Sequence, residues 1–272
     1  MYLCRILAAA VILAAAGGLY VWGVLNGCFF LNHPWPGTYP VRGVDVSHYQ
    51  GAIDWDILET QDIDFAYIKA TEGSSHTDER FSENWEQAGK TGLGIGAYHF
   101  FSFDSPAQSQ ATHFMQTVPA REGMLPPVVD FEFYGDKKVN PPPVEQTAGQ
   151  LAAMLEELEG CYGMRPIIYA TEEAYDMYLA GRFDRYPLWI RNVVRRPDTD
   201  REWLFWQYAN RGRLEGYAGD EEFIDLNVFA GSREQWDAFV KEGVWEEEPQ
   251  ETRREIWFTA MPRRMNWNFW CR

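Results

Sequence analysis

Two acidic residues that stand two positions apart give the first indication of chemistry in this chain. Asp130 and Glu132 follow the apolar run Pro126–Val129 in the segment PPVVDFE. If this segment is a β-strand, residues i and i+2 face the same side, so both carboxyl groups point into one cavity. Two carboxyl groups held close together cannot easily both ionise, so the pKa of one rises. A protonated carboxyl beside an ionised one supplies the two roles that cleavage of a glycosidic bond requires.

Two further carboxylates occupy comparable positions. Asp45 lies in GVDVSHYQ and Asp225 in FIDLN, each near the end of a short apolar segment. Acidic residues are depleted in strands and costly inside a barrel, so the four together indicate one shared site. A metal site is the other interpretation, but metal-dependent hydrolysis usually recruits His. His48 and His99, which lie beside candidate strand ends, have no second His at ligand spacing. We therefore expect neither a metal nor another cofactor.

The elements that must position these residues are short apolar segments that alternate with amphipathic ones. Eight segments have the composition of strands, at 41–47, 65–71, 94–101, 126–132, 166–170, 187–193, 205–209 and 224–229. Helical patterns lie between the earlier segments, at 54–61, 81–91, 106–117, 145–161 and 173–181. The third helix opens on Ser105 as its cap and Pro106 as its first residue. The alternation predicts an α/β fold, an irregular, TIM-like (β/α) barrel of eight strands.

The last part of this barrel should depart from the regular pattern. Only residues 194–204 separate the sixth and seventh strands, and the next connection, NRGRLEGYAGDEEF, is polar and rich in Gly. We therefore expect loops or hairpins, and not helices, between the last strands. In a barrel of this kind the reactive groups sit at the C-terminal ends of the strands.

An apolar segment of a different kind stands at the N-terminus. Residues 6–25, ILAAAVILAAAGGLYVWGVL, carry no charge and follow Arg5. At about 1.5 Å per helical residue this length crosses the core of a bilayer. The basic residue favours a cytoplasmic N-terminus and export of the rest. The segment is either an uncleaved signal anchor or a cleaved signal, and in the second case LNGC resembles a bacterial lipobox with Cys28 as the lipidated residue.

The chain thus divides into four parts. Residues 1–30 are the membrane anchor or signal, 31–40 a Pro-rich spacer, 41–242 the catalytic barrel, and 243–272 a tail rich in Arg and aromatic residues. The tail is either an appendage packed on the barrel or a segment that contacts the membrane interface or the cell wall. The net charge of −16 argues against binding of nucleic acid, which needs a basic surface. We expect the catalytic domain in the bacterial cell envelope, anchored through residues 6–25, or secreted or lipidated if that segment is cleaved.

Seven motifs in order give the sequence a specific resemblance. Over about 41–242 it resembles the glycoside hydrolase family 25 lysozymes, the Chalaropsis-type N-acetylmuramidases. The motifs are GVDVSHYQGAIDW at 43–55, AYIKATEG at 66–73, GAYHFF at 96–101, PVVDFE at 127–132, PIIYA at 166–170, FWQYA at 205–209 and IDLNVF at 224–229. The resemblance implies cleavage of the β-1,4 bond between N-acetylmuramic acid and N-acetylglucosamine in the glycan strands of peptidoglycan.

The resemblance also implies roles for the four carboxylates. Glu132 looks like the general acid/base. Asp130 looks like either the nucleophile or the group that orients the 2-acetamido oxygen of the substrate as an internal nucleophile. Asp45 and Asp225 look like the remaining carboxylates of the cleft, which tune the pKa of Glu132 and hold sugar hydroxyls or water.

The strand motifs also supply side chains that can bind sugar. Aromatic faces stack on sugars, while Lys and Gln bind hydroxyl or acetamido oxygens. Tyr98 is favoured among the aromatic residues, because Gly96 and Ala97 before it leave room for close approach, whereas Trp189 is expected in the core. The candidate substrate-binding residues are Tyr67, Lys69, Tyr98, Tyr169, Trp206 and Gln207.

Two other functions remain as alternatives to an exported, membrane-tethered muramidase. One is a wall-binding module without activity, against which the intact pair of Asp130 and Glu132 counts. The other is a hydrolase of a different amino-sugar polymer.

Overall fold

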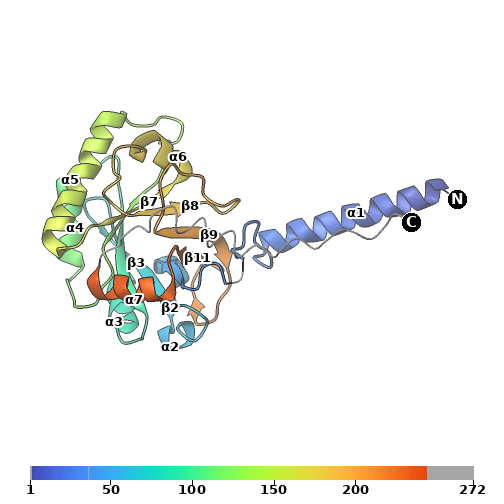
Figure 1. The fold of residues 1–272 in the computed structure, drawn as a ribbon, viewed down its shortest axis with the longest axis horizontal. Helices are drawn as coiled ribbons and strands as arrows, with labels where there is room; N and C mark the ends of the chain where they lie inside the picture. Colours follow the sequence, from blue (N-terminus) through green and yellow to red (C-terminus); the bar gives the residue numbers. More distant parts are fainter. Residues whose placement is uncertain (1, 36, 244–272) are drawn as a thin grey trace, which may run out of the picture.

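Eight strands close into a barrel in the computed structural model, which describes residues 2–35 and 37–243 (Figure 1). The barrel is closed because β1 pairs with β3 on one side and with β11 on the other. The predicted α/β barrel is therefore confirmed. Its strands are β1 (Arg42–Val46), β3 (Phe65–Glu72), β5 (Gly94–Phe100), β6 (Val128–Phe131), β7 (Ile167–Thr171), β8 (Leu188–Arg191), β9 (Phe205–Gly212) and β11 (Ile224–Phe229).

The barrel contains one reversal of strand direction. From β1 through β9 the neighbouring strands are parallel, whereas β11 is antiparallel to both β9 and β1. The reversal follows from the connection after β9, which is too short for a crossover helix. Short strand β10 (Tyr217–Ala218) lies in this connection and pairs with β2 (Ala52–Ile53). The expected loops and hairpins between the last strands are thus confirmed.

Helices lie at each of the five places where the sequence predicts them, with shifted ends. The first is a single turn, α2, because the chain leaves the helix after Leu58. The third begins one residue later than predicted, since the backbone of Pro106 is extended (ψ 135°) and caps the helix from outside it. The observed helices are α2 (Trp55–Leu58), α3 (Phe81–Ala88), α4 (Ala107–Thr117), α5 (Val144–Tyr162), and α6 (Glu172–Ala174) followed by a π-helical turn (Tyr175–Leu179).

Besides the short strands β2 and β10, three elements were not predicted. A 3₁₀ turn (His48–Gln50) follows β1, and β4 (His76–Thr77) folds back on the end of β3. Helix α7 (Arg233–Glu242) starts at a capping box in which Ser232 and Gln235 exchange hydrogen bonds. This S-x-x-Q pattern was a readable signal at the end of the predicted barrel.

Helix α7 closes the end of the barrel at which the parallel strands begin. Its Trp236 and Phe239 are buried against Phe205 and Phe229, which belong to the interior cluster of the barrel. Because one end is filled with aromatic side chains, only the other end of the barrel remains open for a ligand. The larger apolar cluster lies between the outer wall of the barrel and the helices that cover it.

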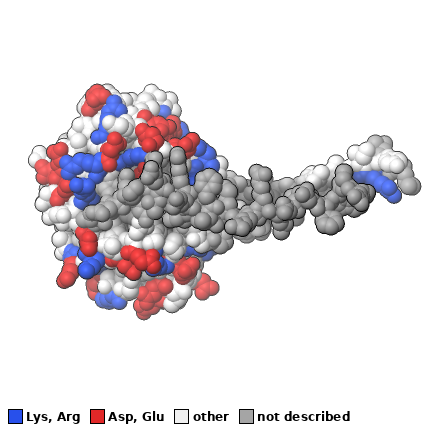
Figure 2. Space-filling model, in the orientation of Figure 1, with Lys and Arg blue, Asp and Glu red and all other residues white. Residues whose placement is uncertain are grey.

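Helix α1 (Tyr2–Leu25) projects away from the barrel, and nearly all of it is exposed (Figure 1). The described residues contain one helix long and apolar enough to cross a membrane, at Arg5–Leu25, a test that signal sequences also pass. Figure 2 shows charges of both signs over the visible face of the barrel and few on the described surface of the projecting helix. The predicted tail lies outside the described residues beyond Gly243.

Gly96 allows a tight contact inside the barrel and gives a test of the packing. A Cβ atom there would lie 2.1 Å from Cε1 of Tyr67, whose ring is fully buried. We expect Gly96→Ala to lower the free energy of unfolding by about 1–3 kcal/mol, because the ring has no free space to enter. Denaturant unfolding of the full chain in detergent measures this.

The matched control is Gly149→Ala in α5, where an added Cβ meets nothing within 4 Å. A helix gains about 0.5–1 kcal/mol from this exchange. Equal stability of the two variants would contradict the packing argument.

Candidate active site

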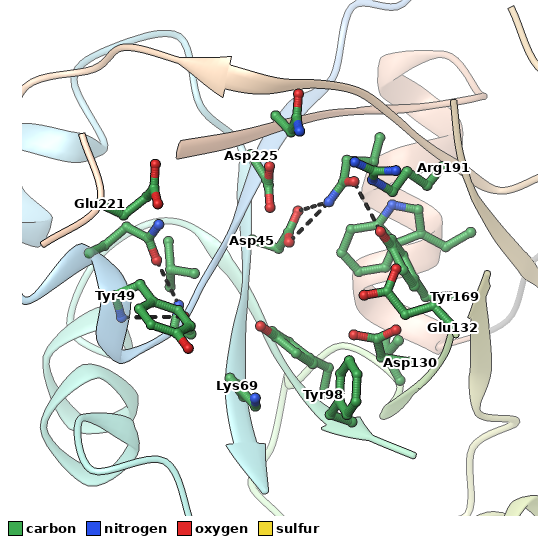
Figure 3. Close-up of a pocket in the computed structure, with 18 of the residues that line it drawn as sticks. Asp45, Tyr49, Lys69, Tyr98, Asp130, Glu132, Tyr169, Arg191, Glu221 and Asp225 are labelled. Carbon is green, nitrogen blue, oxygen red and sulfur yellow. Dashed lines mark hydrogen bonds between the residues drawn. The ribbon is translucent and has the colours of Figure 1, made fainter. Parts of the chain in front are cut away.

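The four predicted carboxylates line one cavity of about 540 Å³ at the open end of the barrel (Figure 3). Asp45 lies near the end of β1 and Asp130 in β6, with Glu132 directly after that strand. Asp225 instead stands near the start of β11. Because β11 is antiparallel, its start reaches the same end of the barrel, where Asp225 lies opposite Asp45 in the sheet.

Asp45 is held by two amide side chains. Nε2 of Gln207 donates to its two carboxylate oxygens at 3.2 and 3.0 Å, and Nδ2 of Asn227 donates to Oδ2 at 2.6 Å. Tyr169 Oη in turn donates to Oε1 of Gln207 at 3.0 Å, which orients the amide. Burial raises the pKa of Asp45, and these hydrogen bonds oppose the rise because they stabilise the carboxylate.

Asp225 and Asp45 form one pair of interacting carboxyl groups. Burial first, and then the negative charge of Asp45, raise the pKa of Asp225 well above its usual range. The contact between the two carboxyl groups further raises the pKa of Asp225 and lowers that of Asp45. These directions favour retention of a proton on Asp225 and a negative charge on Asp45.

Asp130 and Glu132 form a second pair of interacting carboxyl groups. Asp130 is only 9% exposed, and its Oδ1 has no hydrogen-bond partner among the described residues. Burial, followed by the charge of Glu132, raises the pKa of Asp130 well above its usual range. Burial also raises the pKa of Glu132, which Arg191 and Lys69 oppose. Such a pair retains one proton at a pH where isolated carboxyl groups have lost theirs.

Two cations flank the carboxylates. Lys69 on β3 pairs with Glu72 at 2.7 Å and lies 5.0 Å from the centre of the Phe100 ring. Arg191 is the last residue of β8 and lines the same cavity. Arg191 was not among the predicted site residues, although it lies near the end of the predicted strand 187–193.

The structure brings four of the six candidate substrate-binding residues to the cavity: Lys69, Tyr98, Tyr169 and Gln207. Tyr67 is fully buried in the interior cluster, where its Oη donates to the carbonyl of Pro126 at 3.2 Å. Trp206 points to the outside of the barrel, because it alternates with the inward-facing Gln207 along β9. Its Nε1 donates to the carbonyl of Asn192 at 2.9 Å.

Trp189, expected in the core, is 1% exposed and forms part of the cavity floor. Tyr49, which sequence reasoning passed over in the SHYQ motif, is 56% exposed at the cavity and offers a free ring face. Further lining residues that were not singled out are Phe100, Asn210, Arg211, Glu221 and Phe223. Phe100 lies in β5 and Asn210 and Arg211 in β9, whereas Glu221 and Phe223 lie on the connection before β11, whose course could not be read from the sequence.

Paired carboxyl groups in such a cavity can carry out acid/base catalysis. Across the described residues, no group of three or more His, Cys, Asp or Glu is arranged to hold a metal ion. Paired carboxyl groups with raised pKa values, beside aromatic and amide side chains at the mouth of a closed barrel, define a glycoside hydrolase.

Comparison with known proteins identifies the family. Residues 44–217 match the model of the glycosyl hydrolases family 25, which covers more than half of the chain. The chain therefore belongs to glycosyl hydrolase family 25, and its enzyme class is that of the lysozyme-type glycoside hydrolases. Asp45, Asp130 and Glu132 fall inside the matched range, and Asp225 lies beyond its end.

Individual relatives agree with this assignment. The chain is 40% identical over 212 residues to the uncharacterized protein YegX of Escherichia coli K12, with 75% of each chain covered. It is 32% identical to lysozyme M1 of Streptomyces globisporus, over 72% of this chain and 69% of that protein. A family 25 glycosyl hydrolase from Bacillus anthracis superposes with a TM-score of 0.73 at 49% identity, covering 77% of this chain and 97% of that one.

Removal of Arg191 should shift the titration of the cavity. Its positive charge lowers the pKa of Glu132, Asp130, Asp45 and Asp225. We therefore expect Arg191→Gln to raise the pKa of Glu132 above its value in the parent protein, because the opposing positive charge is lost. Carbon-13 NMR titration of the Glu132 carboxyl in the full chain measures the shift.

Arg195→Gln is the matched control, since Arg195 pairs with Glu172 at 2.7 Å outside the cavity. An equal shift in both variants, or none in Arg191→Gln, would show that Arg191 does not act on Glu132 through its charge.

Proposed function

We propose that this chain is an exported, membrane-tethered muramidase. It hydrolyses the β-1,4 bond between N-acetylmuramic acid and N-acetylglucosamine in peptidoglycan. The observation that carries the proposal is the pair Asp130 and Glu132, which share one cavity with a second pair of carboxyl groups. Relatives named as lysozyme and N,O-diacetylmuramidase support the substrate. The exposed apolar helix α1 supports the tether.

Glu132 is the general acid in this mechanism. It lines the cavity together with Asp130 and Arg191 (Figure 3), and burial keeps its pKa above that of an ordinary Glu. In the first step the Glu132 proton passes to the glycosidic oxygen while the bond from that oxygen to C1 breaks. In the second step the resulting carboxylate takes a proton from water, the water oxygen bonds to C1, and the bond that C1 formed in the first step, to Asp130 or to the 2-acetamido oxygen, breaks.

Asp130 acts on the developing positive charge at C1. Its carboxylate either bonds to C1 directly or orients the 2-acetamido group, whose oxygen then bonds to C1. Both routes need an ionised Asp130, so in the reactive complex the single proton of the pair sits on Glu132. Lys69 and Arg191 lower the pKa of both carboxyl groups, so they stabilise the negative charge of the pair without choosing which member keeps the proton.

The aromatic and amide side chains hold the sugar. Tyr98 and the exposed ring of Tyr49 offer faces for stacking, and Tyr169 and Gln207 form a hydrogen-bonded wall that leads to Asp45. The ionised Asp45 accepts hydrogen bonds from sugar hydroxyls or water. We therefore expect the cavity to bind the glycan through stacking on these rings and hydrogen bonds to these polar side chains.

Loss of the general acid tests the assignment. We expect Glu132→Gln to lower kcat by about 10²–10⁴-fold, because the amide cannot protonate the leaving oxygen. In the parent protein the raised pKa keeps Glu132 protonated to higher pH, so the alkaline limb of the rate profile lies above the ordinary Glu value. The full chain in detergent is incubated with peptidoglycan, and the new reducing ends are measured. The sugars at these ends are then reduced chemically and identified as muramic acid or glucosamine.

Glu172→Gln is the control, since Glu172 pairs with Arg195 outside the cavity. Release unaffected by Glu132→Gln, or no release at all, would contradict the muramidase proposal, and no release would favour a wall-binding module without activity. Release from chitin but not from peptidoglycan would favour a hydrolase of another polymer.

The second pair of carboxyl groups predicts an asymmetry between two similar variants. Because Asp225 is the protonated partner, Asn can donate to Asp45 in its place, and Asp225→Asn should retain kcat/KM within about tenfold. Asp45→Asn removes the ionised partner and should lower kcat/KM by about 10²-fold or more. Initial rates on peptidoglycan compare the two, and equal losses would mean that the proton is not on Asp225.

A further inference from the structure

The segment between helix α1 and the barrel packs along the outside of the barrel before it enters the first strand. The first strand starts at the end of the barrel that α7 closes, yet the preceding residues run back along the outer face of β9. Tyr39 packs against Trp206, near the start of β9, with ring centres 6.1 Å apart. His33 packs farther along, against Tyr208, at 5.7 Å. The segment therefore climbs from the closed end toward the open end.

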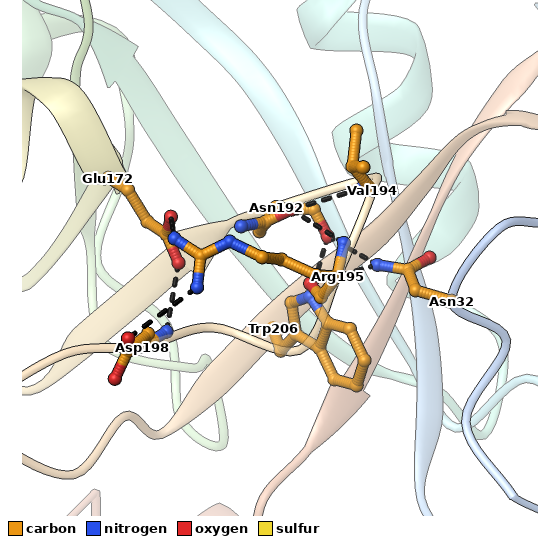
Figure 4. A network of polar contacts seen from close by, with 7 residues as sticks. All are labelled: Asn32, Glu172, Asn192, Val194, Arg195, Asp198 and Trp206. Atoms are coloured by element: carbon orange, nitrogen blue, oxygen red, sulfur yellow. Dashed lines mark hydrogen bonds and ion pairs between the residues drawn. The ribbon is translucent and has the colours of Figure 1, made fainter.

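The middle of this segment is hydrogen-bonded to the loop that follows β8 (Figure 4). Nδ2 of Asn32 donates to the carbonyl oxygens of Asn192 and Arg195, at 2.7 and 3.1 Å. The same loop is held from the other side, where Arg195 pairs with Glu172 at 2.7 Å. Asn192 directly follows Arg191, so the contact lies next to a residue of the cavity.

Two arginines bind the end of helix α1. Arg211 lies in β9, and Arg213 directly follows this strand. Arg211 Nη1 donates to the carbonyl of Leu25 at 2.5 Å, and Arg213 Nε donates to the carbonyl of Asn26 at 2.8 Å. Such bonds satisfy carbonyls that a helix end leaves without partners. Both guanidinium groups also lie over the ring of Phe223, at 5.1 and 4.8 Å from its centre.

Gly27 makes this close approach possible. Its φ of +69° lies in the left-handed region, and a Cβ atom there would come within 2.2 Å of the carbonyl oxygen of Arg211. A larger residue would have to push the helix off β9. By contrast, a Cβ at Gly18 within α1 meets nothing within 4 Å.

These contacts place the anchor at the rim of the cavity. Arg211 and Phe223, which hold the end of α1, both line the cavity. The last residue of α1 is therefore separated from the cavity by a single side chain. A lipid chain on Cys28 would start from the same rim, because Cys28 follows Gly27 directly.

We propose that the docked segment holds the open end of the barrel against the membrane surface, so that the enzyme takes glycan strands that lie at the membrane. The substrate class is an uncross-linked amino-sugar polymer still held at the bilayer, and the cross-linked wall is a poor substrate. The proposal rests on the proposed muramidase function for its substrate and on the contacts of residues 25–35 for its geometry. With a radius of gyration of about 16 Å, a barrel docked in this way stays near the bilayer.

Orientation is tested first, without reference to activity. The four Cys are replaced by Ser, and a single dye is placed either at Asp220, on the loop at the open end, or at Lys90, near the closed end. The full chain is reconstituted in phospholipid vesicles that carry an acceptor dye on the headgroups. We expect much stronger energy transfer from position 220 than from position 90. Equal transfer, or stronger transfer from position 90, would overturn the proposal.

Two variants tie this orientation to the docking contacts. Gly27→Val should lower the transfer from position 220 toward that from position 90, and the matched Gly18→Val should not. Should Gly27→Val fail to fold, the double variant Asn32→Ala/Arg213→Ala removes three docking hydrogen bonds and leaves the cavity residues in place. An orientation unchanged in all the folded docking variants would overturn the role of the segment.

The substrate class is tested on the same vesicles. Glycan strands polymerised on the vesicle from a lipid-linked precursor are compared with isolated cross-linked sacculi. We expect the vesicle-bound chain to cleave the membrane-held strands at least tenfold faster per disaccharide, and Gly27→Val to reduce this ratio. A ratio near one would overturn the substrate class. If neither glycan is cleaved, the muramidase function fails, and the energy transfer still decides the orientation.

Discussion

Four carboxyl groups enclose one cavity, and their mutual repulsion is the constraint around which the open end of the barrel is built. Burial alone would make each of them costly to ionise. The structure offsets the cost in two ways. The pKa values of Asp225 and Asp130 lie well above the usual range, which favours their protonated forms, and Lys69 and Arg191 supply positive charge.

The antiparallel strand β11 is essential to this arrangement. It brings both Asp225 and Asn227 to the neighbourhood of Asp45, one as a proton-sharing partner and one as a hydrogen-bond donor. Asn227 itself is oriented by the indole N–H of Trp189, which donates to Oδ1 at 2.9 Å. The fully buried ring thus positions a carboxylate through an amide, and the aromatic floor and the acidic site form one network.

The barrel could be predicted because its strands carry strong local signals. Each of the eight apolar segments became a strand, since a run of β-branched and aromatic residues has few other ways to bury itself. The side on which each residue lies was harder to predict. Trp206 and Tyr67 stand in predicted strands, yet one faces outward and the other fills the barrel below the cavity. The face on which a residue lies, and its depth along the barrel, both depend on the register in which the strands pair.

Asp225 and Arg191 illustrate two limits of sequence reasoning. Asp225 reaches the open end because its strand is reversed, a fact of topology that the motif does not carry. Arg191 lies near the C-terminal end of a predicted strand, where reactive groups of a barrel are expected. It was nevertheless not among the candidates, although an acidic site regularly needs a neighbouring cation. The docked course of residues 25–35 could not be foreseen, because Pro-rich composition indicates an extended chain and not what it lies against.

The docking of that segment also has a practical consequence for the isolated domain. Phe30, His33 and Tyr39 cover an aromatic strip on the outside of β9 that includes Tyr208 and Trp206. A protein shortened to the first barrel strand would present this strip to solvent as an apolar patch suited to self-association. Expression boundaries for a soluble form should therefore lie before Gly27, so that the chain keeps its own cover.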